Sequence, residues 1–360
     1  MALAILTLLG AIWGGLIRIG WQWPALQPVL VVAHGPLMVS GFLGILIGLE
    51  RAVALSAWYH SAANPANTGR TRHWVYAGPL VSAAGTLLLL VGLPGLAGPL
   101  LMTLGSVILV AVFVVIVRRQ PALYTLTMGL GALAWLIGNG FWLSGWPVHR
   151  VVLWWVAFLA LTIAGERLEL ARILRPSRAS LFAFLAATGL FVIGLLATTV
   201  TYDLGVRLAG LGMVGLALWL LHHDVARHTV RKQGLPRFIA VCLLLGYVWL
   251  VAGGLMAVLF GGIPAGPRYD AMLHAIFAGF VISLIFGHAP IVFPSVLGVP
   301  LAYHSSFYLP LVLLHLSLAL RVGGDLTLWW AGRQWGGLLN ALAILLFLAN
   351  VVRTIRSDRV

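Results

Sequence analysis

Strongly apolar runs of about 20 residues recur along this chain of 360 residues from one end to the other. A run of that length is what an α-helix needs to cross the hydrocarbon core of a bilayer. Charged residues make up only 8% of the chain, against about 25% in a soluble domain. No run shows the alternation that is typical of outer-membrane strands. The sequence therefore predicts an all-α polytopic membrane protein.

Twelve transmembrane segments can be counted, and short linkers join them. Their predicted ranges are 2–20, 29–56, 74–96, 98–118, 122–145, 148–170, 179–200, 204–222, 237–260, 269–290, 305–322 and 335–353. The first run has no basic stretch before it, which favours a first span over a cleavable signal peptide. Because no linker is long enough to hold a soluble domain, we expect a single transmembrane helical domain over residues 1–360.

The formal net charge of +14 comes from arginines that gather at one end of the segments. The even-numbered segments end in basic stretches that contain Arg70, Arg72, Arg118, Arg119, Arg167, Arg172, Arg175, Arg178, Arg227, Arg231, Lys232, Arg237, Arg353, Arg356 and Arg359. The opposite ends hold Arg18, Arg150, Arg207, Arg268, Arg321 and Arg333. By the positive-inside rule the first group is cytoplasmic, and so are both termini. Arginines in short loops are topology signals, so we predict no nucleic-acid partner.

The second segment concentrates residues that are costly inside a bilayer. It carries His34, then the glycines Gly41 and Gly48, and then the neighbouring pair Glu50 and Arg51. A charged group at the bilayer centre costs at least about 2.5 kcal/mol, so such residues are candidates for a functional site.

His274 in segment 269–290 is predicted to lie at the same depth as His34, one and a half turns from the outer end of its helix. Two imidazoles on two helices can ligate a heme iron. Gly41 and Gly48 fall on the face of His34 at about 100° per residue, which lets a porphyrin or a partner helix approach. The alternative is that both histidines hydrogen-bond to other helices and that the glycines serve helix packing.

A second polar layer is predicted near the cytoplasmic ends. It consists of Glu50, Arg51, Glu166, Arg167 and His288. Pairs of Glu50 with Arg167, or of Glu166 with Arg51, would neutralise each other where water is scarce. The layer is either a proton route or polar cavity, or a set of interfacial ion pairs that lock helices together.

Further histidines and prolines give weaker signals. His315 lies in the middle of its segment and is either another metal ligand or an interhelical hydrogen-bond donor. The pair of histidines before Asp224 is predicted to be a solvated helix-capping cluster rather than a copper site. Pro290 and Pro294 predict the end or a break of their helix next to His288. The single Cys242 excludes a disulfide framework and a cysteine-based metal site.

Two stretches resemble the NnrS family, membrane proteins associated with nitric oxide metabolism. One is 34–49, and the other comprises 246–255, 271–280 and 287–288. The twelve spans also resemble subunit I of the heme-copper oxidases, which holds its low-spin heme on spans 2 and 10. The resemblance implies a bacterial cytoplasmic membrane, heme b at His34 and His274, and copper as a second candidate cofactor.

The resemblance is incomplete at the catalytic centre. The oxidases and nitric oxide reductases place histidines on spans 6 and 7, and the corresponding segments here have none in their interior. A binuclear centre, and with it an enzyme activity, is therefore not predicted. The expected role is electron transfer with a quinol or cytochrome partner, or the handling of nitric oxide or another diatomic gas. The alternatives are a proton- or ion-coupled transporter or channel without cofactor, and an accessory subunit or assembly factor of a respiratory complex.

Overall fold

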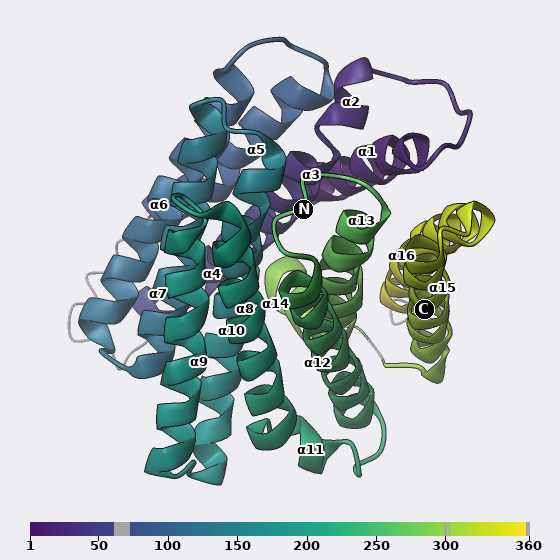
Figure 1. Cartoon of the computed structure of the whole chain (residues 1–360). Coiled ribbons are helices and arrows are strands. Elements are labelled where there is room, and N and C mark those ends of the chain that lie inside the picture. Colours follow the sequence, from purple (N-terminus) through teal and green to yellow (C-terminus); the bar gives the residue numbers. More distant parts are fainter. Residues whose placement is uncertain (61–72, 299–300, 302, 358–360) are drawn as a thin grey trace. The chain divides into compact units, whose positions relative to one another are not determined.

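The computed structural model describes residues 1–60, 73–298, 301 and 303–357, and it shows helices and no strand in those ranges (Figure 1). Among these residues, eleven helices are long and apolar enough to cross a membrane, and α1 (Ala2–Arg18) is a shorter apolar helix. The prediction of an all-helical, multi-pass membrane protein is thereby confirmed. Arg70, Arg72 and Arg359, which entered the topology argument, lie outside the described residues.

The helices group into two compact units, residues 1–165 and 166–360. Unit 1 holds α1, α2 (Pro28–Val32), α3 (His34–Pro36), a π-helical segment (Leu37–Leu43), α4 (Gly44–His60), a 3₁₀ turn (His73–Tyr76), α5 (Ala77–Leu90), α6 (Ala97–Arg119), α7 (Leu123–Leu143) and most of α8 (Val148–Ala171). The boundary between the units falls inside α8. The single transmembrane domain over residues 1–360 stays a prediction.

Unit 2 begins with the end of α8. It continues with a 3₁₀ turn (Arg172–Leu174), α9 (Arg178–Ala197), α10 (Tyr202–His223), α11 (Ala226–Thr229), α12 (Leu235–Phe260), α13 (Pro267–His274), a π-helical segment (Ala275–Ile282), α14 (Ser283–Leu297), a 3₁₀ turn (Ser305–Phe307), α15 (Tyr308–Thr327) and α16 (Trp330–Ser357). Every predicted segment has its counterpart, and most bounds agree within a few residues.

The segments that carry His34 and His274 differ from the prediction, because neither is one regular α-helix. In unit 1, α2 ends at Val32 and the chain restarts at His34 before it becomes π-helical. Pro36 contributes to this break, since it has no N–H to donate to the carbonyl of the preceding turn. Successive residues of a π-helix are not 100° apart. The spacing of His34, Gly41 and Gly48 therefore does not put them on one face of the helix.

The predicted break at Pro290 and Pro294 is wrong. Helix α14 contains both prolines and continues to Leu297. It ends where Gly298 adopts a left-handed conformation with φ of 66°, the usual glycine stop. Proline is tolerated inside membrane helices because neighbouring groups satisfy the freed carbonyls. His288 therefore lies within a helix, and the irregular backbone of this span follows His274 instead.

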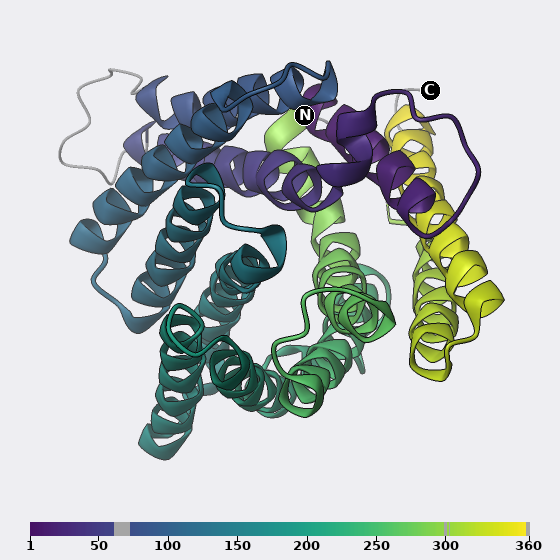
Figure 2. The same cartoon turned by 45° about the horizontal axis from the view of Figure 1, so that its top comes forward.

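Glycines bring the backbones of α9 and α10 close together, and the two helices lie side by side in both ribbon views (Figure 2). A Cβ atom at Gly194 would lie 2.2 Å from the backbone nitrogen of Ala209, and one at Gly205 would lie 2.3 Å from that of Thr198. Small residues at helix contacts are typical of membrane proteins, where packing drives association.

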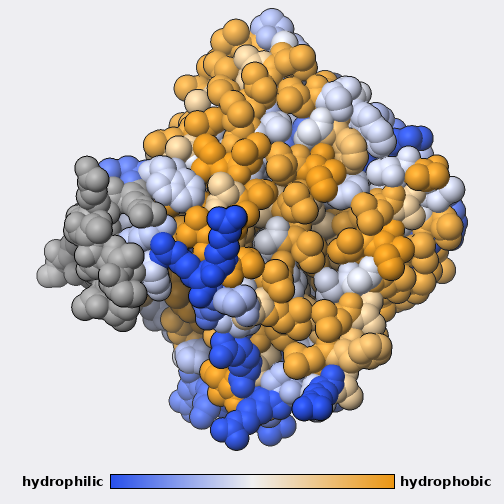
Figure 3. All heavy atoms as spheres, turned by 90° about the vertical axis from the view of Figure 1, so that its left-hand side faces the viewer, coloured by the Kyte–Doolittle hydropathy of each residue, from blue (hydrophilic) through white to orange (hydrophobic). Residues whose placement is uncertain are grey.

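The outward surface is apolar, as a lipid-facing surface must be. Phe182 and Val200 are 73% and 86% exposed, an arrangement that suits acyl chains rather than water. Figure 3 shows one face that is mostly hydrophobic, with the strongly hydrophilic residues mainly toward its lower part. Contact with a lipid bilayer follows from these surfaces.

The close contact of α9 and α10 gives a first prediction. Gly194→Ala should lower the midpoint of thermal unfolding in detergent by several degrees, because the added methyl meets backbone atoms and overpacking costs about 1–3 kcal/mol. The matched control is Gly189→Ala on the same helix, where a Cβ meets nothing within 4 Å. Equal midpoints for the two variants would contradict the packing described here.

Candidate functional site

His34 stands at the start of α3 in unit 1 and is held by α1. Its Nδ1 lies 2.6 Å from the carbonyl oxygen of Ala11. A carbonyl only accepts, so Nδ1 carries the proton and donates it. The ring also lies against Gly15, where a Cβ would be 2.7 Å from its Cε1 atom. In the neutral imidazole the lone pair is therefore on Nε2.

His274 ends α13 in unit 2 and has the same tautomer. Its Nδ1 lies 2.9 Å from the carbonyl oxygen of Asp270 and 3.3 Å from the carboxylate oxygen Oδ1 of the same residue. Histidines that ligate metals almost always donate their second nitrogen to a carbonyl or carboxylate, which fixes the ring and raises its basicity. The donor chemistry of both histidines thus fits a metal-bearing cofactor.

Each of the two histidines is followed within three residues by a π-helical segment. These segments are Leu37–Leu43 after His34 and Ala275–Ile282 after His274, and the described part of the chain has no other. π-Helical turns are rare and occur frequently at functional sites. The sequence singled out the histidines, and the structure adds an irregular backbone beside both.

The glycines predicted to flank His34 lie against helices of unit 1. A Cβ at Gly41 would be 2.7 Å from Cγ2 of Thr7 on α1, and one at Gly48 would be 3.6 Å from Cδ of Pro79 on α5. This arrangement favours the helix-packing interpretation of both glycines over a face for a porphyrin.

His34 belongs to unit 1 and His274 to unit 2. Within the described ranges no cluster of three or more His, Cys, Asp or Glu side chains could hold a metal ion. A heme with two histidine ligands therefore stays a prediction.

Unit 2 contains a buried ionic cluster around His274, made of residues from α13, α15 and α16. Arg321 binds the Asp270 carboxylate with two hydrogen bonds, of 3.0 Å from Nε and 3.1 Å from Nη2. Arg333 Nε lies 2.9 Å from Oδ1 of Asp325 and 3.8 Å from Oδ2 of Asp270. The start of α13, the end of α15 and the start of α16 thus meet at one end of unit 2.

Most of this ionic cluster is not predictable from the pattern of the sequence. Arg321 and Arg333 fit the positive-inside pattern as topology signals, and Asp270 and Asp325 belong to no motif. Two spacings were available as signals, since Asp270 precedes His274 by four residues and Arg321 precedes Asp325 by four. Carboxylates at such positions in apolar segments need partners, and helix faces at this spacing supply them.

The inner polar layer contains a second buried pair in unit 2. Arg167 Nε lies 3.4 Å from Oδ2 of Asp224, and the hydroxyl of Tyr247 donates to the same oxygen at 2.5 Å. Asp224 is 1% exposed and also accepts from the backbone N–H of Ala226. His222, Arg227 and His228 are exposed as predicted for a solvated cluster, whereas Asp224, which caps the end of α10, is buried.

The remaining members of the layer are placed as follows. Glu50 and Arg51 lie in the middle of α4, with 3.4 Å between Oε1 and Nη2. Glu166 is half-buried near the end of α8, next to Arg167. The predicted pairs of Glu50 with Arg167 and of Glu166 with Arg51 stay predictions.

His315 has hydrogen-bond partners at both ring nitrogens. The indole N–H of Trp249 donates to Nδ1 at 3.0 Å, so Nε2 carries the proton and faces the hydroxyl of Ser283 at 3.2 Å. Ser283 in turn donates to the carbonyl of Cys242. These contacts favour the interhelical hydrogen-bond role. His288 directs Nδ1 to the carbonyl of Leu284 at 2.7 Å, within its own helix.

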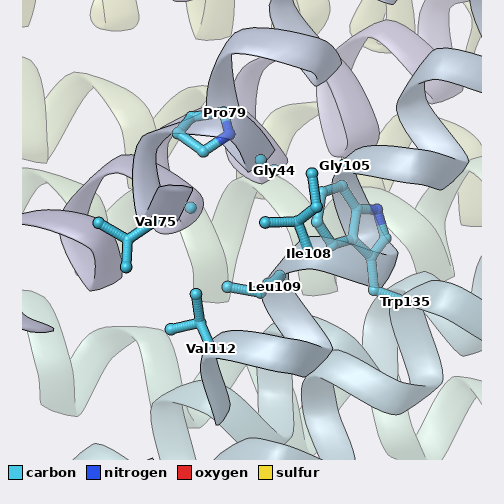
Figure 4. A pocket seen from close by; sticks show the side chains of 10 residues that line it. Gly44, Val75, Pro79, Gly105, Ile108, Leu109, Val112 and Trp135 are labelled. Carbon is cyan, nitrogen blue, oxygen red and sulfur yellow. The ribbon is translucent and has the colours of Figure 1, made fainter. Parts of the chain in front are cut away.

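A small crevice in unit 1 is lined almost entirely by apolar groups, including Gly44, Pro79, Ile108 and Trp135 (Figure 4). It encloses about 220 Å³ between atoms, but none of that space is wide enough for a water molecule. A Cβ at Gly44 would lie 2.4 Å from the Trp135 ring. The crevice is therefore a seam between packed helices and not a ligand pocket.

Comparison with known proteins gives one match. A family model described as a domain of unknown function, DUF8744, matches residues 1–356. No curated protein and no solved structure matches the chain. The resemblance to the NnrS family thus stays a prediction, and function has to be argued from the side chains of the chain itself.

The ionic cluster gives a second prediction. Arg321→Gln should lower stability by about 3–5 kcal/mol, because it leaves the buried Asp270 carboxylate without its main partner. The control is Asp203→Asn, which removes the exposed ion pair with Arg207 while its amide oxygen can still accept from the N–H of Gly262, and it should change stability little. Thermal unfolding in detergent compares the two, and equal losses would show that the Asp270 pair contributes no more than a surface pair.

Proposed function

The chain belongs to the DUF8744 family, whose function is unknown, and we propose that it is a multi-pass membrane protein that binds heme b. The candidate axial ligands are His34 in unit 1 and His274 in unit 2. One observation carries the proposal, namely that each histidine has its Nδ1 fixed by a carbonyl and is followed within three residues by a π-helical segment. The first feature is typical of metal-ligating histidines, and the second is typical of functional sites.

The chain itself would supply the environment for this heme. The carbonyls of Ala11 and Asp270 fix the two rings, and the Asp270 carboxylate makes His274 a stronger ligand. When bound, heme iron exchanges single electrons or binds a diatomic gas such as nitric oxide, depending on whether its sixth position is taken. The proposal includes copper as a second candidate cofactor. It also includes a quinol or a cytochrome as the partner that exchanges electrons with the heme.

The proposed topology completes this function. We count α1, although shorter than the other spans, as the first of twelve. An even number of spans puts both termini on the same side of the membrane, and the arginine distribution supports the cytoplasmic side. The membrane is the cytoplasmic membrane of a bacterium, and both candidate ligands lie toward its outer face.

The third prediction tests heme binding by absorption spectroscopy. Protein that is purified in detergent and supplied with heme should show a Soret band, with sharp α and β bands after reduction if the iron has two histidine ligands. His34→Ala and His274→Ala should each remove or broaden these bands, whereas the exposed His228→Ala should not. Heme stoichiometry shows whether the two histidines serve one iron or two.

Folded protein without a Soret band would overturn the heme proposal, and so would bands that both histidine variants leave unchanged. That result would favour the second candidate, a proton- or ion-coupled transporter or channel. The buried cluster of Asp270, Arg321, Asp325 and Arg333 supports this alternative, because ionisable groups inside the membrane are functional candidates by default.

A further inference from the structure

Asp325, near the end of α15, is the least satisfied charged group of the ionic cluster. Its side chain is 0% exposed, and neither of its carboxylate oxygens has a hydrogen bond. Nε of Arg333 lies 2.9 Å from Oδ1 of Asp325, but its N–H bond is not directed at that oxygen. The contact is therefore an ion pair without a hydrogen bond. A buried carboxylate needs both a countercharge and hydrogen bonds to repay its lost hydration, and Asp325 has the countercharge alone.

Asp270, in contrast, is well satisfied as an anion. It accepts two hydrogen bonds from Arg321 and lies beside Nδ1 of His274. Asp270 and Asp325 also share a counterion, since Nε of Arg333 lies 3.8 Å from Oδ2 of Asp270 and 2.9 Å from Oδ1 of Asp325. Two ionised carboxylates are both acceptors, so a hydrogen bond between them forms only when one carries a proton. Neutralising Asp325 therefore breaks fewer hydrogen bonds and ion pairs than neutralising Asp270 would.

We propose that Asp325 is a proton-binding site inside the membrane domain. A proton from water adds to one carboxylate oxygen, which gives a neutral acid whose O–H donates to Asp270. The charged group in contact with Asp325 is Arg333 from α16, which also lies near Asp270 of α13. Asp270 in turn pairs with Arg321 from α15 and with His274. With both carboxylates ionised, two negative and two positive charges cancel, and the added proton leaves one net positive charge.

Proton binding has a structural consequence at Arg333. The guanidinium pairs with Asp325 at 2.9 Å and already lies 3.8 Å from Asp270. Once Asp325 is neutral, Asp270 is the remaining anion within reach, so Arg333 shifts toward it. Gly324 brings α15 close to α16 here, since a Cβ would lie 2.4 Å from the backbone nitrogen of Arg333. A shift of this side chain therefore acts directly on the contact of two helices.

The proposal is independent of heme binding, and its test reads the proton itself. Infrared spectroscopy of the lipid-reconstituted full chain detects a protonated carboxyl group by its C=O stretch above the amide I band. The chain has only 8 acidic residues, so the loss of one band can be assigned. In difference spectra recorded at a pH where exposed carboxylates are already ionised, the wild type should show a C=O band that disappears as pH is raised further and that shifts to lower frequency in deuterated water.

Two variants locate the proton. Asp325→Asn should abolish the band, while Asp203→Asn, at an exposed carboxylate paired with Arg207, should leave it in place. Asp325→Glu should keep the band at a shifted frequency, which preserves the test if the asparagine variant does not fold. A wild type without such a band at any pH, or a band that survives Asp325→Asn, would overturn the proposal and leave Asp325 as a permanent ion-pair partner of Arg333.

Discussion

The bilayer offers no water to a buried polar group, and the rest of this structure depends on that constraint. Backbone groups must be satisfied within each segment, so the chain crosses as helices. Ionisable side chains must find partners on neighbouring helices, as Arg321 does at Asp270 and Arg167 does at Asp224. The polar clusters therefore mark where helices distant in sequence are fastened to one another within unit 2.

Helix positions could be predicted from the sequence because hydrophobicity and length determine them locally. The break after Val32 and the two π-helical segments could not, because they depend on which backbone carbonyls find other donors in three dimensions. Pro290 shows the opposite error. A rule learned from soluble helices predicts a break there, but in α14 the surrounding helices tolerate the missing N–H.

Site residues were predictable only where one segment carries the signal. His34 and His274 stand out in apolar runs, and the structure gives both a fixed tautomer. The partners of His274 were hidden because Arg321 follows Asp270 by 51 positions, and only the folding of α15 onto α13 joins them. His315 shows the reverse case. It stands out equally in the sequence, yet Trp249 and Ser283 occupy both of its nitrogens.

Asp270 links the two chemistries argued for unit 2. Its carbonyl and carboxylate hold Nδ1 of His274, while the same carboxylate binds Arg321 and lies 3.8 Å from Arg333. Asp325 shares Arg333 with this carboxylate, so a change in charge at Asp325 alters the surroundings of Asp270. The two proposals nevertheless remain separable, because heme ligation requires the lone pair of an imidazole and proton binding requires only the oxygens of Asp325. An observed coupling between them would identify Asp270 as the connecting group.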